Sequence, residues 1–143
     1  MKNVVVTGMG IISCIGSGLN EVLSSLKNGK SGIKPNPTYK EMGFRSHVSG
    51  SVDINLSELI DRKVLRFMSE ASGFAYLATQ EALIKAGLDL SSIDTSRIGI
   101  VAGSGGASSA AQIEASDIAR AKGPKRIGPY AVTKTMGSTV SAI

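Results

Sequence analysis

The chain has 143 residues, 42% hydrophobic and 19% charged, which is typical of a globular protein rather than a disordered one. Its formal net charge of +5 favours an acidic partner, but no interleaved aromatic and basic residues and no finger-like Cys/His spacing indicate nucleic acid. A single cysteine excludes an internal disulfide, and no segment has the roughly 18 apolar residues that a membrane helix needs. We therefore expect a cytoplasmic protein that binds neither nucleic acid nor membrane.

The first third of the chain predicts a strand, a helix and a loop. Val4–Thr7 is a β-branched run of strand type, and the glycine turn Gly8–Gly10 closes it. Residues 19–28 predict a short helix with its apolar side chains on one face, and Gly29 stands where a left-handed C-cap belongs. The Gly- and Pro-containing residues 30–45 predict a surface loop.

The middle of the chain predicts the longest helix between two strands. Residues 47–52 are expected to form a short strand, and residues 97–102 a second buried strand that closes on the glycine turn 103–106. Residues 67–86 predict the helix, which Gly87 ends. Steps of three and four place its apolar residues along one alanine-rich stripe, which implies close packing: Phe67, Ala71, Phe74, Ala75, Ala78, Ala82 and Ala86.

The last third predicts a further helix over residues 108–121, followed by two Gly-Pro breaks and a final segment, residues 130–143. Strand, helices, strand and helix in this order predict an α/β layered core with a parallel sheet. Residues 139–143 resemble a helix that has just begun and carry no stop signal. We therefore expect the chain to be part of a longer one.

Three glycine-rich segments partly match phosphate-binding motifs. Gly8–Ser13 follows a strand, but Ser13 replaces the third glycine of a dinucleotide-binding loop, and no acidic residue ends a second strand about 20 residues later. A Rossmann-type nucleotide binder is therefore a weak alternative to a structural glycine turn. Gly29–Ser31 lacks the earlier glycine of a P-loop, and residues 103–106 lack its Lys-Ser/Thr, so we interpret the latter as close backbone packing.

No group of residues predicts catalysis, a metal site or a cofactor. Cys14 and His47 are the only cysteine and histidine, and they fall on separate short elements, so we interpret them as packing and surface residues. Asp61 and Glu70 do not pair as a general acid and base would. Zinc sites need three or four ligands at characteristic spacing, which this sequence lacks.

Two clusters of basic residues are the most informative charged features. If residues 61–66 are helical, Arg62 and Arg66 share one face, with Lys63 beside them. Lys125 and Arg126, near Lys122, form a second cluster in the Gly/Pro-rich loop. Solvated surface charge and an electrostatically steered docking site for an acidic partner both remain open interpretations at this point.

Six segments keep their order and spacing over the whole chain: VVVTGMGIIS (4–13), GKSGI (29–33), RSHVSGSV (45–52), LIDRKVLRFMSEAS (59–72), GIVAGSGG (99–106) and GPYAVTKTM (128–136). Together they resemble the start of the β-ketoacyl-acyl-carrier-protein (ACP) synthases, the condensing enzymes of fatty-acid synthesis. IDRKVLRFMS and GPYAVTKTM are similar in particular to the type I bacterial enzymes. The resemblance implies that residues 1–143 are an incomplete N-terminal domain, part of the N-terminal half of a thiolase-like layered α/β fold.

The resemblance also implies a function. Members of this family are homodimers that condense acyl-ACP with malonyl-ACP by decarboxylative Claisen chemistry, without a cofactor or metal. Their catalytic Cys, His and Lys residues lie beyond position 143, and Cys14 and His47 match none of them, so we expect the 143 residues alone to be inactive. The alternative is a non-catalytic binding or dimerisation module with a thiolase fold.

Site residues are implied in the same way. Arg62, Lys63 and Arg66 match the family's basic patch for the acidic carrier protein, and this match favours the docking interpretation. Lys125 and Arg126 lie in the second basic region of that surface, in a loop that is shorter than in close relatives. The acyl-chain pocket is matched by two residues, Gly106 and Met136, the latter from across the dimer interface.

Overall fold

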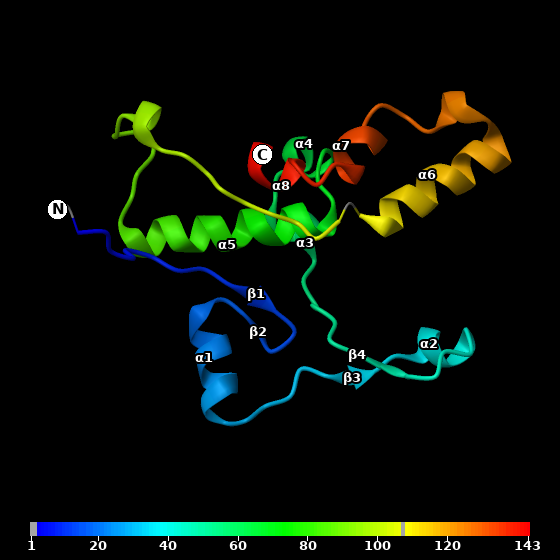
Figure 1. Cartoon of the computed structure of the whole chain (residues 1–143), viewed down its shortest axis with the longest axis horizontal. Coiled ribbons are helices and arrows are strands. Elements are labelled where there is room, and N and C mark those ends of the chain that lie inside the picture. The colour runs from blue at the N-terminus through cyan, green and yellow to red at the C-terminus, as the bar shows by residue number, and fades with distance from the viewer. Residues whose placement is uncertain (1–2, 107) are drawn as a thin grey trace. The chain divides into compact units, whose positions relative to one another are not determined.

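The computed structural model describes residues 3–106 and 108–143, and the chain divides into two compact units (Figure 1). The first contains residues 1–54 and 77–88, and the second contains residues 55–76 and 89–143. The longest helix, α5 (Glu70–Ala86), contributes to both. Among the described residues, no helix has the length and apolarity needed to span a membrane.

The first unit opens with a small hairpin that leads into a helix. Its elements are β1 (Ile12–Ser13), which pairs antiparallel with β2 (Gly16–Ser17), and α1 (Leu19–Lys27). The Ser25 hydroxyl, buried on α1, donates a 2.6 Å hydrogen bond to the Ile15 carbonyl and so fastens the helix to the hairpin. Gly29 has a φ of 62°, which confirms both the predicted helix and its glycine stop.

Residues 30–52 form a second hairpin with a short helix between its strands. The elements are β3 (Lys34–Pro35), α2 (Pro37–Glu41) and β4 (Val48–Ser49), and β3 pairs antiparallel with β4. The Asn36 side chain caps α2 by accepting a 3.3 Å hydrogen bond from the Tyr39 amide, and Pro37 occupies the first turn, where no N–H is needed. The loop prediction is therefore wrong at α2, because Asn-Pro here starts a helix.

In the first unit the glycine segment Gly8–Gly10 packs against helix α5. A Cβ atom at Gly8 would overlap the carbonyl oxygen of Ala82, and one at Gly10 would overlap that of Ala78. The chain therefore approaches the helix backbone at a distance that only glycine permits. This contact confirms the interpretation of Gly8–Gly10 as structural and the close packing predicted from the alanine stripe.

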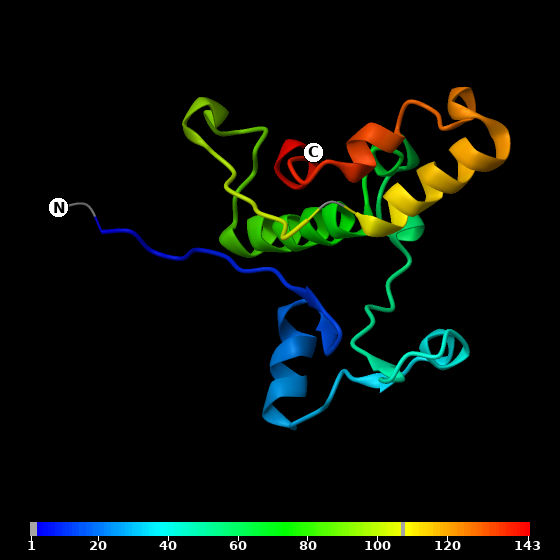
Figure 2. The same ribbon diagram turned by 45° about the vertical axis from the view of Figure 1, so that its right-hand side comes forward.

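The two predicted long strands do not form within the described residues. Val4 and Val6 are 97% and 81% exposed, Val101 is fully exposed, and the segment ahead of β1 runs as an extended trace in both views (Figures 1 and 2). The described strands belong to the two antiparallel hairpins, so the predicted parallel sheet is absent from this part of the protein. A strand forms only when a neighbouring backbone accepts its hydrogen bonds, and β propensity alone does not provide one.

The second unit is helical. Besides its part of α5 it contains α3 (Leu56–Leu59), α4 (Arg62–Leu65), the 3₁₀ helix η1 (Thr95–Arg97), α6 (Ser109–Lys122), the 3₁₀ helix η2 (Pro124–Arg126), α7 (Ala131–Thr135) and α8 (Thr139–Ala142). Ile60 and Met68 are its buried apolar residues among those described. Ser108 caps α6 by accepting from the Ala111 amide at 3.3 Å, which confirms the predicted helix. α4 and α7 lie side by side in both views (Figures 1 and 2).

Helix α5 begins three residues later than predicted. The Ser69 hydroxyl lies 3.4 Å from the Ser72 amide and accepts a hydrogen bond from it, as an N-cap residue does. Phe67 instead belongs to the turn after α4, where its amide donates to the Val64 carbonyl at 3.1 Å. This turn places the Phe67 ring against the ring of Tyr130.

Candidate functional site

Helix α4 presents the first basic cluster. The Asp61 carboxylate caps the helix by accepting a 2.7 Å hydrogen bond from the Lys63 amide, so the helix starts where the basic residues begin. Arg62, Lys63 and Arg66 are all exposed. Together with Asp61 and Tyr130 they border a surface hollow of about 550 Å³. The structure thus brings the three predicted residues together.

The second basic cluster lies on η2, in the same unit. Gly123, with a φ of 84°, ends α6 and turns the chain into η2, which carries Lys125 and Arg126 on exposed positions. Four residues later the chain reaches Tyr130, whose ring contacts the Arg66 guanidinium. The segment carrying the second cluster is therefore joined to the first cluster through one aromatic side chain.

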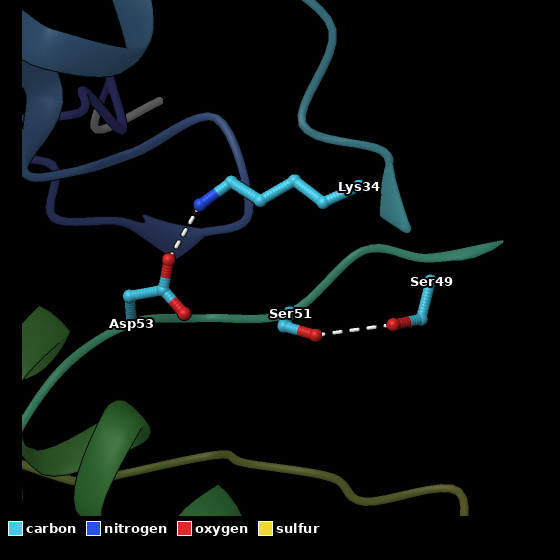
Figure 3. Close-up of polar contacts among 4 residues, drawn as sticks. All are labelled: Lys34, Ser49, Ser51 and Asp53. Atoms are coloured by element: carbon cyan, nitrogen blue, oxygen red, sulfur yellow. Dashed lines mark hydrogen bonds and ion pairs between the residues drawn. The ribbon is translucent and has the colours of Figure 1, made fainter. Parts of the chain in front are cut away.

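Neither cluster is neutralised by carboxylates of the described residues. The ion pairs found there are Lys34–Asp53 and Glu81–Lys85, and they involve none of the five basic site residues. Figure 3 shows the Lys34 ammonium aimed at Asp53, beside the hydrogen-bonded hydroxyls of Ser49 and Ser51. The hydrogen bond and charge of Asp53 raise the pKa of Lys34 above its ordinary value, so this lysine is a paired cation.

Gly106 and Met136, 30 positions apart in the sequence, line the same hollow of about 260 Å³. Its other walls come from the start of α5, the start of α6 and Val140 of α8. No atom lies within 4 Å of the position that a Cβ of Gly106 would occupy, so the missing side chain leaves open space. Within one chain the structure thus places Gly106 and Met136 on the same hollow, whereas the resemblance implies that Met136 reaches the acyl-chain pocket from across the dimer interface.

The close packing predicted for the glycine turn 103–106 is wrong. Gly103, Gly105 and Gly106 all have open space where a Cβ would lie. The turn is held instead by Ser104, whose hydroxyl donates a 2.7 Å hydrogen bond to the Gly106 carbonyl. A local side-chain hydrogen bond and not a close neighbour shapes this turn.

Cys14 and His47 belong to the first unit and line neither of these hollows. The Cys14 sulfur is 2.7 Å from where a Cβ of Gly32 would stand and 3.1 Å from that of Gly50, so it fills the space left by two glycines. His47 is exposed. Within residues 3–106 and 108–143, no group of three or more His, Cys, Asp or Glu side chains could hold a metal ion.

Sequence reasoning missed two aromatic residues of the site. The Phe67 and Tyr130 rings meet edge to face, with centroids 5.0 Å apart and planes at 87°. The Arg66 guanidinium carbon lies 4.9 Å from the Phe67 centroid and 5.3 Å from the Tyr130 centroid. Both distances are within the range of cation–π attraction. Phe67 adjoins the basic cluster in the sequence, but no local pattern links it to Tyr130.

Comparison with known families extends the resemblance. The family described as β-ketoacyl synthase, N-terminal domain, matches residues 1–143. The chain is 52% identical over 143 residues to 3-oxoacyl-[acyl-carrier-protein] synthase 1 of Haemophilus influenzae, which covers 99% of this chain and 35% of that protein. It is 48% identical over 144 residues to the protein of the same name from Escherichia coli, covering 99% and 36%. The chain thus spans about a third of the length of these relatives.

Solved structures agree on the fold. A β-ketoacyl synthase from Burkholderia phymatum superimposes with a TM-score of 0.82 at 24% identity, over 99% of this chain and 36% of that one. A ketosynthase in complex with its type II polyketide acyl-carrier protein gives a TM-score of 0.74 at 23% identity, over 99% and 37%. These similarities confirm the predicted fold class, an α/β chain forming part of the N-terminal half of a thiolase-like fold. The chain therefore belongs to the β-ketoacyl synthase family, whose N-terminal domain it matches from residue 1 to residue 143.

Proposed function

We propose that this chain is part of a 3-oxoacyl-ACP synthase, a cytoplasmic homodimer that condenses acyl-ACP with malonyl-ACP in fatty-acid elongation. In this proposal the 143 residues supply the surface that docks the carrier protein and one part of the acyl-chain pocket. The observation that carries it is the exposed basic cluster at Arg62, Lys63 and Arg66, in a chain 48–52% identical to 3-oxoacyl-ACP synthases 1.

Electrostatics supports carrier docking at this cluster. Three cations within five residues of each other, with no carboxylate partner among the described residues, create a local positive potential. Such a patch steers an acidic protein toward it and fixes the orientation of the encounter. Lys125 and Arg126 would add a second point of contact. The solved ketosynthase in complex with its acyl-carrier protein is a structural neighbour with the same fold.

The hollow beside Gly106 and Met136 supports a role in acyl binding. An acyl chain is an unbranched hydrocarbon that needs a narrow apolar channel. The open space at Gly106 leaves room for an acyl chain. The flexible Met136 side chain can adjust its conformation to the end of that chain. We propose that in the homodimer Met136 instead closes the end of the acyl-chain pocket across the interface.

The reaction itself needs residues other than those described here. A cysteine thiolate attacks the acyl-ACP thioester and releases the carrier thiol, which is a covalent ping-pong step. Malonyl-ACP then loses carbon dioxide, and its carbanion displaces the thiolate from the acyl-enzyme. Cys14 packs against Gly32 and Gly50, whereas His47 is exposed directly before β4. The two side chains therefore do not form a Cys–His pair that would activate a thiolate.

Charge reversal tests carrier docking. Replacing Arg62→Glu together with Arg66→Glu in the 143-residue chain is expected to weaken binding of fluorescein-labelled apo-ACP about tenfold, because each change juxtaposes like charges. The difference should shrink at about 0.5 M salt, where screening is strong. Fluorescence anisotropy titration measures both.

The matched control is Lys27→Glu with Lys40→Glu, which changes the net charge equally on α1 and α2 of the first unit. This variant is expected to bind ACP with nearly the affinity of the unmodified chain. If both double variants lose affinity alike, net charge alone explains binding and α4 is not the docking site.

A further inference from the structure

The Arg66 guanidinium is held by two aromatic rings at the edge of the basic cluster. Arg66 is the C-cap residue of α4, and its amide donates to the Arg62 carbonyl at 3.3 Å. Its side chain then lies over Phe67 and Tyr130, with the guanidinium carbon 4.9 Å and 5.3 Å from the two ring centroids. The two rings are themselves packed edge to face. Two aromatic side chains from two segments therefore support one cation.

Aromatic support keeps the cation available in a way that an ion pair does not. A carboxylate partner would neutralise the guanidinium and occupy its hydrogen-bond donors, whereas a ring face attracts the cation and leaves its N–H groups free at the edge. Arg66 belongs to no ion pair within the described residues and stays exposed. A free arginine side chain loses rotamer entropy when it binds, and one already held loses less.

Tyr130 comes from the segment that carries the second basic cluster. It lies four residues after Arg126, at the N-cap of α7, and its ring lines the hollow in front of α4 as well as a smaller one against α6. Its contact with Phe67 and Arg66 therefore ties the segment that carries Lys125 and Arg126 to α4.

We propose that Tyr130 is a positioning residue of the docking surface: its ring preorganises the Arg66 guanidinium for binding. The inference rests on the proposed function, since the partner it prepares for is an acidic carrier protein. Tyr130 itself need not touch that partner. Its effect on binding should therefore pass through Arg66.

The test is a double-mutant cycle in the 143-residue chain, titrated with labelled apo-ACP at low salt. Tyr130→Leu removes the ring and should weaken binding about threefold, the size expected of an exposed cation–π contact. Tyr130→Phe keeps the ring and should bind like the unmodified chain. In an Arg66→Ala background, Tyr130→Leu should cause little further loss, because the group it positions is gone. Tyr39→Leu, which breaks the separate Tyr39–Phe44 ring pair, is the control and should not change binding.

Two measurements separate positioning from general damage. The NMR signal of the Arg66 Nε–H group should show a ring-current shift without ACP present. The shift should be kept in Tyr130→Phe and reduced in Tyr130→Leu, where only the Phe67 ring remains beside the guanidinium. Arg66→Lys retains the charge and leaves Tyr130 intact, but a compact ammonium cannot stack as a planar guanidinium does, so it too should weaken binding.

The outcomes distinguish the two proposals. If Arg62→Glu with Arg66→Glu weakens binding but Tyr130→Leu does not, or if the losses from Tyr130→Leu and Arg66→Ala are fully additive, the positioning role is overturned and docking stands. If the unmodified chain does not bind ACP, or binds it regardless of the charge reversals, docking fails and the positioning role falls with it.

Discussion

At the scale of single residues, Glu81 shows how one side chain organises the first unit. Its carboxylate accepts hydrogen bonds from the Leu19 amide at 2.8 Å and the Ile11 amide at 3.1 Å, and Lys85 lies 3.8 Å away. Glu81 therefore fastens the start of α1 and the β1 hairpin to α5. The hydrogen bond from Leu19, then that from Ile11 and the charge of Lys85, hold the pKa of Glu81 below its ordinary value of 4.5.

The lowered pKa of Glu81 predicts the direction of a pH effect. A depressed carboxyl pKa stabilises the folded state fully above the ordinary value, and the stabilisation is lost as pH falls through the folded pKa. Glu81→Gln is expected to lower the free energy of unfolding by about 1–2 kcal/mol at neutral pH, the range for charged hydrogen bonds reduced for partial exposure. The difference should nearly vanish at acidic pH, below the folded pKa.

Urea unfolding followed by circular dichroism at the two pH values measures this difference. Glu114→Gln, on the exposed face of α6, is the control and should leave the free energy of unfolding unchanged at both. A Glu81→Gln effect of the same size at neutral and acidic pH would mean that the side-chain shape, and not its charge, matters.

At the scale of elements, the longer helices are set by local sequence signals. The position of the segment around Gly10 is set by one close contact with a distant residue. Asn36, Asp61 and Ser108 each cap the helix that follows them, as their side-chain hydrogen bonds to the backbone show. Caps and apolar periodicity act within about four residues, so α1, α5 and α6 could be predicted to within a few positions. The segment around Gly10 is different, because its partner, Ala78, is 68 positions away.

The contact between Gly10 and α5 predicts a large difference between two glycine substitutions. Gly10→Ala places a Cβ on the Ala78 carbonyl oxygen, and the backbone shift needed to relieve it should cost about 1–3 kcal/mol of unfolding free energy. Gly105→Ala, where the Cβ would meet open space and φ is not positive, should change stability by less than about 0.5 kcal/mol. Thermal or urea unfolding of both variants checks this. Equal effects would exclude the close approach at Gly10.

At the scale of the whole molecule, the apolar residues are mostly not buried. Val22, Ile60 and Met68 are the buried hydrophobic residues among those described, whereas the β-type segments around Val5 and Val101 are exposed. Exposed apolar segments of this kind pair readily with other chains, so self-association is expected in solution. The basic cluster on α4 and the Gly106 hollow both lie in the second unit.

The whole-molecule proposal predicts binding without catalysis. The 143-residue chain should bind ACP yet form no β-ketoacyl-ACP from acyl-ACP and malonyl-ACP, because the resemblance places the catalytic Cys, His and Lys residues outside this stretch, which spans about a third of its relatives' length. A mass-spectrometric assay of the ACP products checks this, with an intact 3-oxoacyl-ACP synthase 1 as the positive control. Formation of β-ketoacyl-ACP by the chain alone would show that the catalytic residues had been misassigned.

The sequence by itself determined the family, the three longest helices (α1, α5 and α6) and the identity of the basic cluster. These depend on ordered motifs, on caps and on spacings of three and four residues, all of which are local. The tertiary structure alone decided that Gly106 and Met136 line one hollow, that Arg66 lies on Tyr130, and that Glu81 holds Leu19. It also decided that Val4–Thr7 and residues 98–102 form no strand and that Arg97 belongs to the 3₁₀ helix η1. The physical reason is the same throughout: contacts between distant segments, including every strand pairing, depend on which backbone lies alongside, and no local pattern records that.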